Sequence, residues 1–178
     1  TYGTNGFYLP FKNDYTVEGF SAVTWKGTGE RGTYVGGVGF KSNLVWIKNR
    51  TTNGANHLLF DTLRNPSMNA GSFRPDSTNS SAQSKDELSG VSADGITLQE
   101  GGDANGSGKQ IVAWNSDMGA DTPTGFSCIT WVGNSNANNS ISGVGFQPDL
   151  IISHRRSGAD NGMVFDSVRG ENARLLHI

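Results

Sequence analysis

The stretch GFSAVTW at residues 19–25 returns as GFSCITW at residues 125–131. Three further blocks return in the same order and at nearly the same spacing. GVGF at 37–40 recurs at 143–146, LVWI at 44–47 corresponds to LIIS at 150–153, and FDTLR at 60–64 corresponds to FDSVR at 165–169. Four ordered blocks at matched spacing indicate tandem copies of one structural unit.

The first repeated stretch alternates in the manner of a half-buried β-strand. Phe20, Ala22 and Thr24 fall on one face, and the residues between them fall on the other. β-Branched and aromatic side chains of this kind suit a pleated surface. We therefore expect a strand at 19–25 and, because the second copy keeps the chemistry, another at 125–131.

Other short apolar runs complete the set of expected strands, and turn residues separate them. They lie at 44–48, 57–61, 96–98 and 111–114, with counterparts of the first two at 150–154 and 162–166. A short strand is also expected at 72–74, inside a segment at 64–90 that is otherwise expected to be irregular, and its counterpart is expected at 175–176. The two glycines of the GVGF block predict positive φ or a close backbone approach.

Short strands with a turn about every ten residues favour an all-β fold, built of tandem antiparallel β-sandwich units that are jelly-roll-like. We expect residues 1–15 to be the terminal strand of an upstream domain or an added strand, 16–123 to be the first unit, and 124–178 to be the second. The second unit is incomplete, because nothing in it corresponds to 96–98 or 111–114. A sandwich cut there has an unpaired edge. We expect either that the chain continues past Ile178 or that another chain or unit supplies the missing strands.

Charge, apolar content and cysteine count limit the classes of partner and fold that the chain could have. The net charge is −2 and the charges are scattered, so electrostatics favour neither nucleic acid nor a membrane surface as a partner. No run of residues is long and apolar enough to predict a membrane span. The single cysteine, Cys128, excludes an internal disulfide framework. It stands where the first copy has Ala22, so we interpret it as a small core residue and not as a reactive thiol.

No sequence pattern leads us to assign a catalytic residue, a metal ligand or a cofactor. The run DANGSG at 103–108 resembles the start of a calcium loop, but its twelfth position is Trp114 and not glutamate, which favours a plain hairpin turn. The three histidines lack the spacing of a metal site and are expected to be surface or strand residues: His57, His154 and His177.

Two acidic residues recur, and each has an arginine three residues later. These are Asp61 with Arg64 and Asp166 with Arg169. A carboxylate pair could serve a glycosidase. An aspartate and an arginine at this spacing across a turn more often form a structural ion pair, and we favour that interpretation.

Among the four tryptophans, Trp46 is the candidate ligand-binding residue. Trp25 and Trp131 occupy equivalent places inside the repeated stretch, which favours packing roles for both. Trp46 differs between the copies, since the second has Ile152 there, and an exposed indole could stack on a sugar. The isoleucine also fits a core position, so both interpretations stay open.

The repeated blocks resemble a repeated β-domain of unknown function in tail fibre and appendage structural proteins of tailed bacteriophages, especially marine ones. The resemblance rests on GFSxxTW, on GVGFQPDLII at 143–152, on FDSVRG at 165–170, and on NGSG at 105–108 followed by IVAW at 111–114. Residues 2–9, YGTNGFYL, are similar to the closing strand of a concanavalin-like domain that often precedes these repeats. The chain departs from the family at 41–43, where the family favours a proline, and in the early stop of the second copy.

The resemblance implies a non-enzymatic virion structural protein on the particle surface, a tail fibre or appendage component involved in assembly and host-surface adhesion. It implies other virion proteins as partners, a host cell-surface glycan as a further one, and a homo-oligomer, often a trimer. The alternative is a carbohydrate-binding, lectin-like module of a phage or bacterial surface protein. A glycan depolymerase would need two carboxylates at glycosidase separation. Ligand-binding residues are expected where the copies differ, at 26–32, 49–56 and 64–90.

Overall fold

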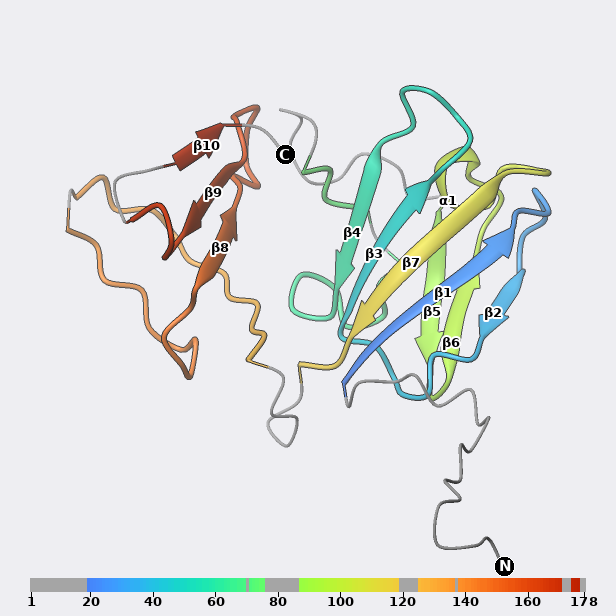
Figure 1. The fold of residues 1–178 in the computed structure, drawn as a ribbon, viewed down its shortest axis with the longest axis horizontal. Helices are drawn as coiled ribbons and strands as arrows, with labels where there is room; N and C mark the ends of the chain where they lie inside the picture. The colour runs from blue at the N-terminus through green and yellow to red at the C-terminus, as the bar shows by residue number, and fades with distance from the viewer. Residues whose placement is uncertain are drawn as a thin grey trace, which may run out of the picture.

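The protein is described by a computed structural model, which covers residues 19–69, 71–75, 87–118, 125–136, 138–170 and 174–176. Within these ranges the regular elements are β-strands and one short helical turn (Figure 1). In chain order they are β1 (Phe20–Lys26), β2 (Tyr34–Gly36), β3 (Leu44–Asn49), β4 (His57–Asp61), β5 (Leu88–Ser92), β6 (Gly95–Leu98), α1 (Gly102–Asn105), β7 (Gln110–Ser116), β8 (Leu150–Ser153), β9 (Met163–Asp166) and β10 (Arg174–Leu176).

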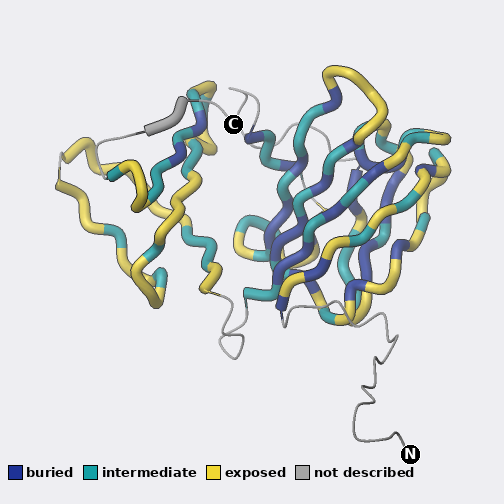
Figure 2. The backbone as a smooth tube through the Cα atoms, in the orientation of Figure 1, coloured by how far each residue is buried: buried dark blue, intermediate teal, exposed yellow. Residues whose placement is uncertain are grey.

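The first copy of the repeat forms two packed antiparallel sheets, which confirms the all-β sandwich expected from the sequence. One sheet has the strand order β1-β7-β3-β4, and the other has the order β2-β6-β5. Their facing side chains make a buried core. Figure 2 colours the buried stretches of both sheets dark blue. The larger sheet contributes Val45, Ile47, Leu58, Phe60, Ile111 and Ala113, and the smaller contributes Val35, Leu88, Ile96 and Leu98.

Strand β7 is central to the first unit although it comes last in that unit. It pairs with β1 on one side and with β3 on the other, from Phe20 opposite Ser116 to Lys26 opposite Gln110 along β1. Strand β1 lies at the edge of this sheet, and β7 is its one neighbour there. The burial of β1 follows the predicted alternation, since the Phe20 face is exposed while Val23 and Trp25 pack against the core.

The GVGF block forms a connection between strands. Gly37 and Gly39 have φ of 84° and 87°, and Gly143 and Gly145 repeat this with 96° and 85°, which confirms the predicted positive φ. Only glycine adopts these angles without strain. The carboxylate of Asp94 accepts hydrogen bonds from the N–H groups of Gly37 and Gly39, so this block is fixed to the turn between β5 and β6.

Strand β5 corrects the expectation of an irregular segment at 64–90, because it begins at Leu88. It forms a hairpin with β6 across a two-residue turn that contains Asp94, with Ser92 opposite Gly95. The expected strand at 72–74 is present as a single bridge between Phe73 and Leu59.

The second copy forms a three-stranded sheet with the order β10-β9-β8. Strands β8 and β9 confirm the expectations at 150–154 and 162–166. In β10, Leu175 lies opposite Val164, as Phe73 lies opposite Leu59 in the first copy, which confirms the expected counterpart at 175–176.

The prediction of a strand at 125–131 is wrong. These residues have no regular structure, and Phe126 and Trp131 are exposed. The reason lies in the strand order: their counterpart β1 pairs only with β7, and in the described part of the second copy no strand corresponds to β7. Residues 1–18, which include the expected terminal strand, and His177 lie outside the described residues.

Candidate binding face on the four-stranded sheet

An apolar row crosses the outer face of the larger sheet, the face turned away from the core. The strand register places Ala22, Trp114, Trp46 and Leu59 next to one another, one from each strand, and Phe73 continues the row beyond Leu59. Ala22 is exposed and the other four are half-buried. Trp46 therefore lies outside the core, and of the two interpretations left open by the sequence, the core position is excluded. Its neighbours Val45 and Ile47 are the residues that fill the core.

The indole of Trp46 is held by aromatic contacts on two sides. Its ring lies edge-to-face with Trp114 at 5.9 Å between centroids, and with His57 at 5.7 Å. The indole N–H also donates a hydrogen bond to Nδ1 of His57 at 2.9 Å. This bond requires Nδ1 to be an acceptor, so the neutral ring carries its proton on Nε2. A preorganised aromatic cluster of this kind suits contact with a flat apolar ligand face.

The end of the row at Phe73 is covered by the chain itself. The guanidinium of Arg64 lies 5.6 Å from the centre of the Phe73 ring, and His154 of the second copy packs edge-to-face against the same ring at 4.6 Å. The part of the row open to a partner is therefore at Trp46, Trp114 and Ala22. Sequence comparison of the copies pointed to Trp46 but missed Trp114 and His57, whose roles depend on strand register.

Both Asp–Arg pairs form the ion pairs that the sequence predicts. Arg64 Nε contacts the carboxylate of Asp61, its backbone N–H donates to the same carboxylate at 2.8 Å, and its Nη2 donates to the Leu59 carbonyl at 2.7 Å. Arg169 and Asp166 repeat the pairing and the backbone bond, at 2.9 Å. The side-chain hydrogen bond from Arg169 holds the pKa of Asp166 below its ordinary value.

The calcium-like run at 103–108 forms the helical turn α1 and a tight turn after it, which corrects the expected plain hairpin. Asp103 pairs with Arg74 at 3.9 Å and accepts a hydrogen bond from Asn56 at 3.3 Å. Asn105 is fully buried and serves as a hydrogen-bond centre for the surrounding loops. Among the described residues, no group of three or more His, Cys, Asp and Glu side chains could hold a metal ion.

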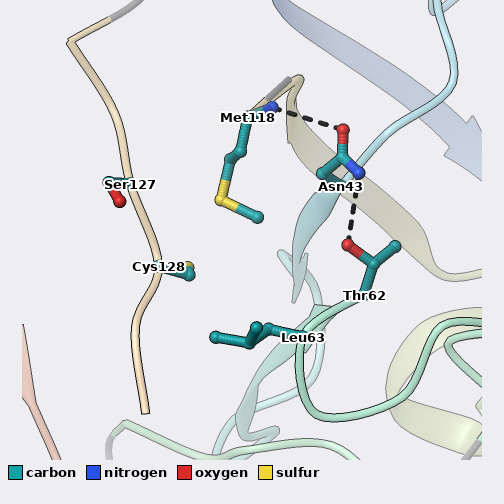
Figure 3. A pocket seen from close by; sticks show the side chains of 6 residues that line it. All are labelled: Asn43, Thr62, Leu63, Met118, Ser127 and Cys128. Carbon is teal, nitrogen blue, oxygen red and sulfur yellow. Dashed lines mark hydrogen bonds between the residues drawn. The ribbon is translucent and has the colours of Figure 1, made fainter. Parts of the chain in front are cut away.

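A shallow hollow of about 230 Å³ lies between the end of the larger sheet and residues 127–128 (Figure 3). Its lining consists of Asn43, Thr62, Leu63, Met118, Ser127 and Cys128. Burial raises the pKa of the Cys128 thiol to about 11, and the negative charge of Asp61 adds to this effect. The thiol is thus protonated at neutral pH, which agrees with an unreactive cysteine. The prediction that Cys128 is a core residue is wrong, however, because the half-buried thiol lines this hollow and does not belong to the sandwich core.

A family model described as a domain of unknown function, DUF7483, matches the chain twice, over residues 15–125 and 121–177. The chain belongs to this family. The double match agrees with the internal repeat, and it confirms the resemblance to a repeated domain of unknown function. No curated protein and no solved structure matches the chain significantly. In the part of the chain that the structure describes, no helix is long and apolar enough to cross a membrane.

Proposed function

We propose that this DUF7483 chain is a non-enzymatic structural protein of a bacteriophage particle, a tail fibre or appendage component at the virion surface that serves assembly and host attachment. The observation that supports this most is the tandem repetition of one β-sheet unit, which the family model matches twice. Among the described residues, strand β8 of the second copy also has an apolar surface, since Leu150, Ile151 and Ile152 are 57%, 45% and 38% exposed. A contiguous exposed apolar surface on a folded chain is typical of an interaction site.

Tandem repetition suits an adhesive role for a physical reason. When one weak contact has formed, the neighbouring unit is held close to its own target, and its effective concentration there rises. A homo-oligomer such as a trimer multiplies the effect. The partners in this proposal are other virion proteins and, at the host surface, a cell-envelope glycan.

The test is the location of the protein in infected cultures. Purified virions of the phage that encodes the chain should contain its tryptic peptides at a fixed copy number per particle. An antiserum against the chain should label an appendage by electron microscopy. Recovery of the protein only from the soluble lysate, with none in the particles, would contradict the proposal.

A carbohydrate-binding module is the second candidate, and the aromatic row favours it. Trp46 and Trp114 present half-buried indoles on an outer sheet face. A glycan array should then give a signal that Trp46→Leu lowers at least tenfold. Trp131→Leu is the matched control, since it removes an exposed indole of the second copy that is not part of the four-stranded sheet. If the intact chain is silent on the array, this candidate is wrong.

A further inference from the structure

The outer face of the four-stranded sheet carries positive charge beside its aromatic row. In each strand the residues between the core positions point outward, and two of these are lysines, Lys48 on β3 and Lys26 on β1. The four strands contain one carboxylate, Asp61, and it is paired with Arg64. The charge of this face is therefore opposite in sign to the net charge of the chain, which is −2.

Lys48 lies next to the indoles. It follows Trp46 by two residues on the same face of β3, so their Cα atoms are about 7 Å apart. Its partner on β7, Val112, is likewise two residues from Trp114. The ammonium group of Lys48 donates a hydrogen bond to the carbonyl of Ala55, which fixes its position. Since an ammonium group has three N–H donors, it can also pair with an anionic group of a ligand.

Exposed polar side chains border the indoles on the same side as Lys48. Thr24 lies opposite Val112, and Gln110 lies opposite Lys26. The usual spacing of strands and of residues along them puts the Cα atoms of the two lysines about 12 Å apart. A long ligand rich in hydroxyl groups that reaches from one lysine to the other therefore meets hydrogen-bonding side chains as well as both positive charges.

We propose that this face binds an acidic polysaccharide, a polymer whose sugar rings include uronic acids. The C–H groups on the apolar side of a pyranose ring pack on the indole of Trp46 or Trp114, because the face of an aromatic ring carries partial negative charge. A carboxylate of the same polymer pairs with Lys48, and another further along it pairs with Lys26. This inference rests on the carbohydrate-binding candidate and names the class of sugar that it would bind.

Single-stranded nucleic acid fits the same residues less well. Proteins that bind it stack successive bases on aromatic side chains along a positively charged groove. Here the planes of Trp46 and Trp114 are inclined by 69°, so two parallel bases cannot stack on both indoles. Two lysines also neutralise few phosphates, and affinity for nucleic acid depends mainly on that number.

The test is a glycan array that carries uronic-acid polysaccharides, alginate and polygalacturonate among them. Beside each stands the same polymer after reduction of its carboxyl groups to primary alcohols, which makes it neutral. EDTA in the buffer prevents calcium from cross-linking the acidic polymers. The intact chain should bind the acidic forms at least tenfold more strongly than the neutral forms. A rise in NaCl from about 0.05 to 0.5 M should weaken binding to the acidic forms at least threefold, because salt screens the charges.

Variants separate the contribution of charge from that of stacking. Lys48→Gln should lower binding to the acidic forms at least fivefold and leave binding to the neutral forms unchanged, whereas Lys48→Arg should keep both. Trp46→Leu should lower both. Lys41→Gln is the matched control and should change neither, because Lys41 is exposed and lies outside the four strands. Circular dichroism spectra equal to that of the parent chain show that each variant is folded.

The outcomes distinguish this inference from the functions it builds on. Equal binding of the acidic and neutral forms, or equal effects of Lys48→Gln and Lys41→Gln, would overturn the inference and leave the carbohydrate-binding candidate in place. Stronger binding to single-stranded DNA spotted on the same array would also overturn it. Silence on every glycan would overturn the inference together with that candidate. The virion role is tested separately, by the location of the protein in particles.

Discussion

Replacement of Asn105 by alanine tests whether the Gly-rich turn after α1 stabilises the first unit. The side chain is fully buried. Its amide nitrogen donates to the carbonyls of Gln99 at 2.8 Å and Glu30 at 2.9 Å, and its oxygen accepts from the backbone N–H of Thr28 at 3.0 Å. One side chain thus joins the β1–β2 connection to the β6–β7 connection in which it lies.

The expected cost follows from these three bonds. Each is worth about 1 kcal/mol net, and an unsatisfied buried carbonyl costs about 1–3 kcal/mol. We therefore expect Asn105→Ala to lower the free energy of unfolding by about 3 kcal/mol. For a unit of roughly a hundred residues this corresponds to a fall in Tm of about 15 °C. Asn105→Asp keeps the shape but places a carboxylate oxygen against two carbonyls, so it should destabilise at neutral pH as well.

Urea and thermal unfolding followed by circular dichroism and tryptophan fluorescence measure this effect. Asn53→Ala is the matched control, because Asn53 is exposed in a turn of the same unit. The control should stay within about 0.5 kcal/mol of the parent chain. A loss below about 1 kcal/mol for Asn105→Ala would refute the view that this residue stabilises the loops.

Three further predictions concern the ion pairs and the thiol. Arg64→Met should lower the free energy of unfolding by about 3 kcal/mol, since it strands the buried Asp61 carboxylate, whereas Arg169→Met should change it far less because that pair is more exposed; equal losses in parallel urea titrations would contradict this. In an NMR titration the pKa of Asp166 should lie below the ordinary value of an aspartate and rise in Arg169→Met. Because the folded-state pKa is lowered, the stabilisation by this pair is present above the unfolded pKa and is lost as the pH falls through the folded pKa. At pH 8, iodoacetamide should alkylate Cys128 about a hundredfold more slowly in the folded chain than in urea, since its pKa is about 11 instead of 9.0; similar rates would refute the shift.

The strands that the sequence predicted well are those with a local signal. Alternation of side chains identified β1, and short apolar runs bounded by turn residues identified β3, β4 and β7, each to within one or two residues. The positive φ of Gly37 and Gly39 could also be predicted from the local sequence, since glycine is the residue that tolerates this conformation. These features together were sufficient to infer the sandwich.

The candidate site was harder to predict because its residues meet through register. The alternation of β3 separates Trp46 from Val45, but it does not say which face the second sheet covers. That choice depends on β2, β5 and β6, and β5 itself was hidden in a segment rich in turn residues. The contact of Trp46 with Trp114 joins strands that are distant in sequence and adjacent only because β7 is inserted between β1 and β3.

The two copies of GFSxxTW show that a strand sequence is not sufficient for a strand. Intrinsic β-propensity spans only about 1 kcal/mol per residue and depends on context, so the ladder and the packing decide the outcome. In the first copy, seven residues of β1 pair with β7, and Trp25 packs on the core and donates its indole N–H to the Ala104 carbonyl. In the second copy the same pattern has neither a β7 neighbour nor a core among the described residues, and Trp131 is 51% exposed. Residues 125–131 correspond in sequence to β1. In the first copy β1 joins its sheet through β7, which lies between β1 and β3. In its described residues the second copy is a three-stranded sheet, and the sandwich seen in the first copy depends on β7.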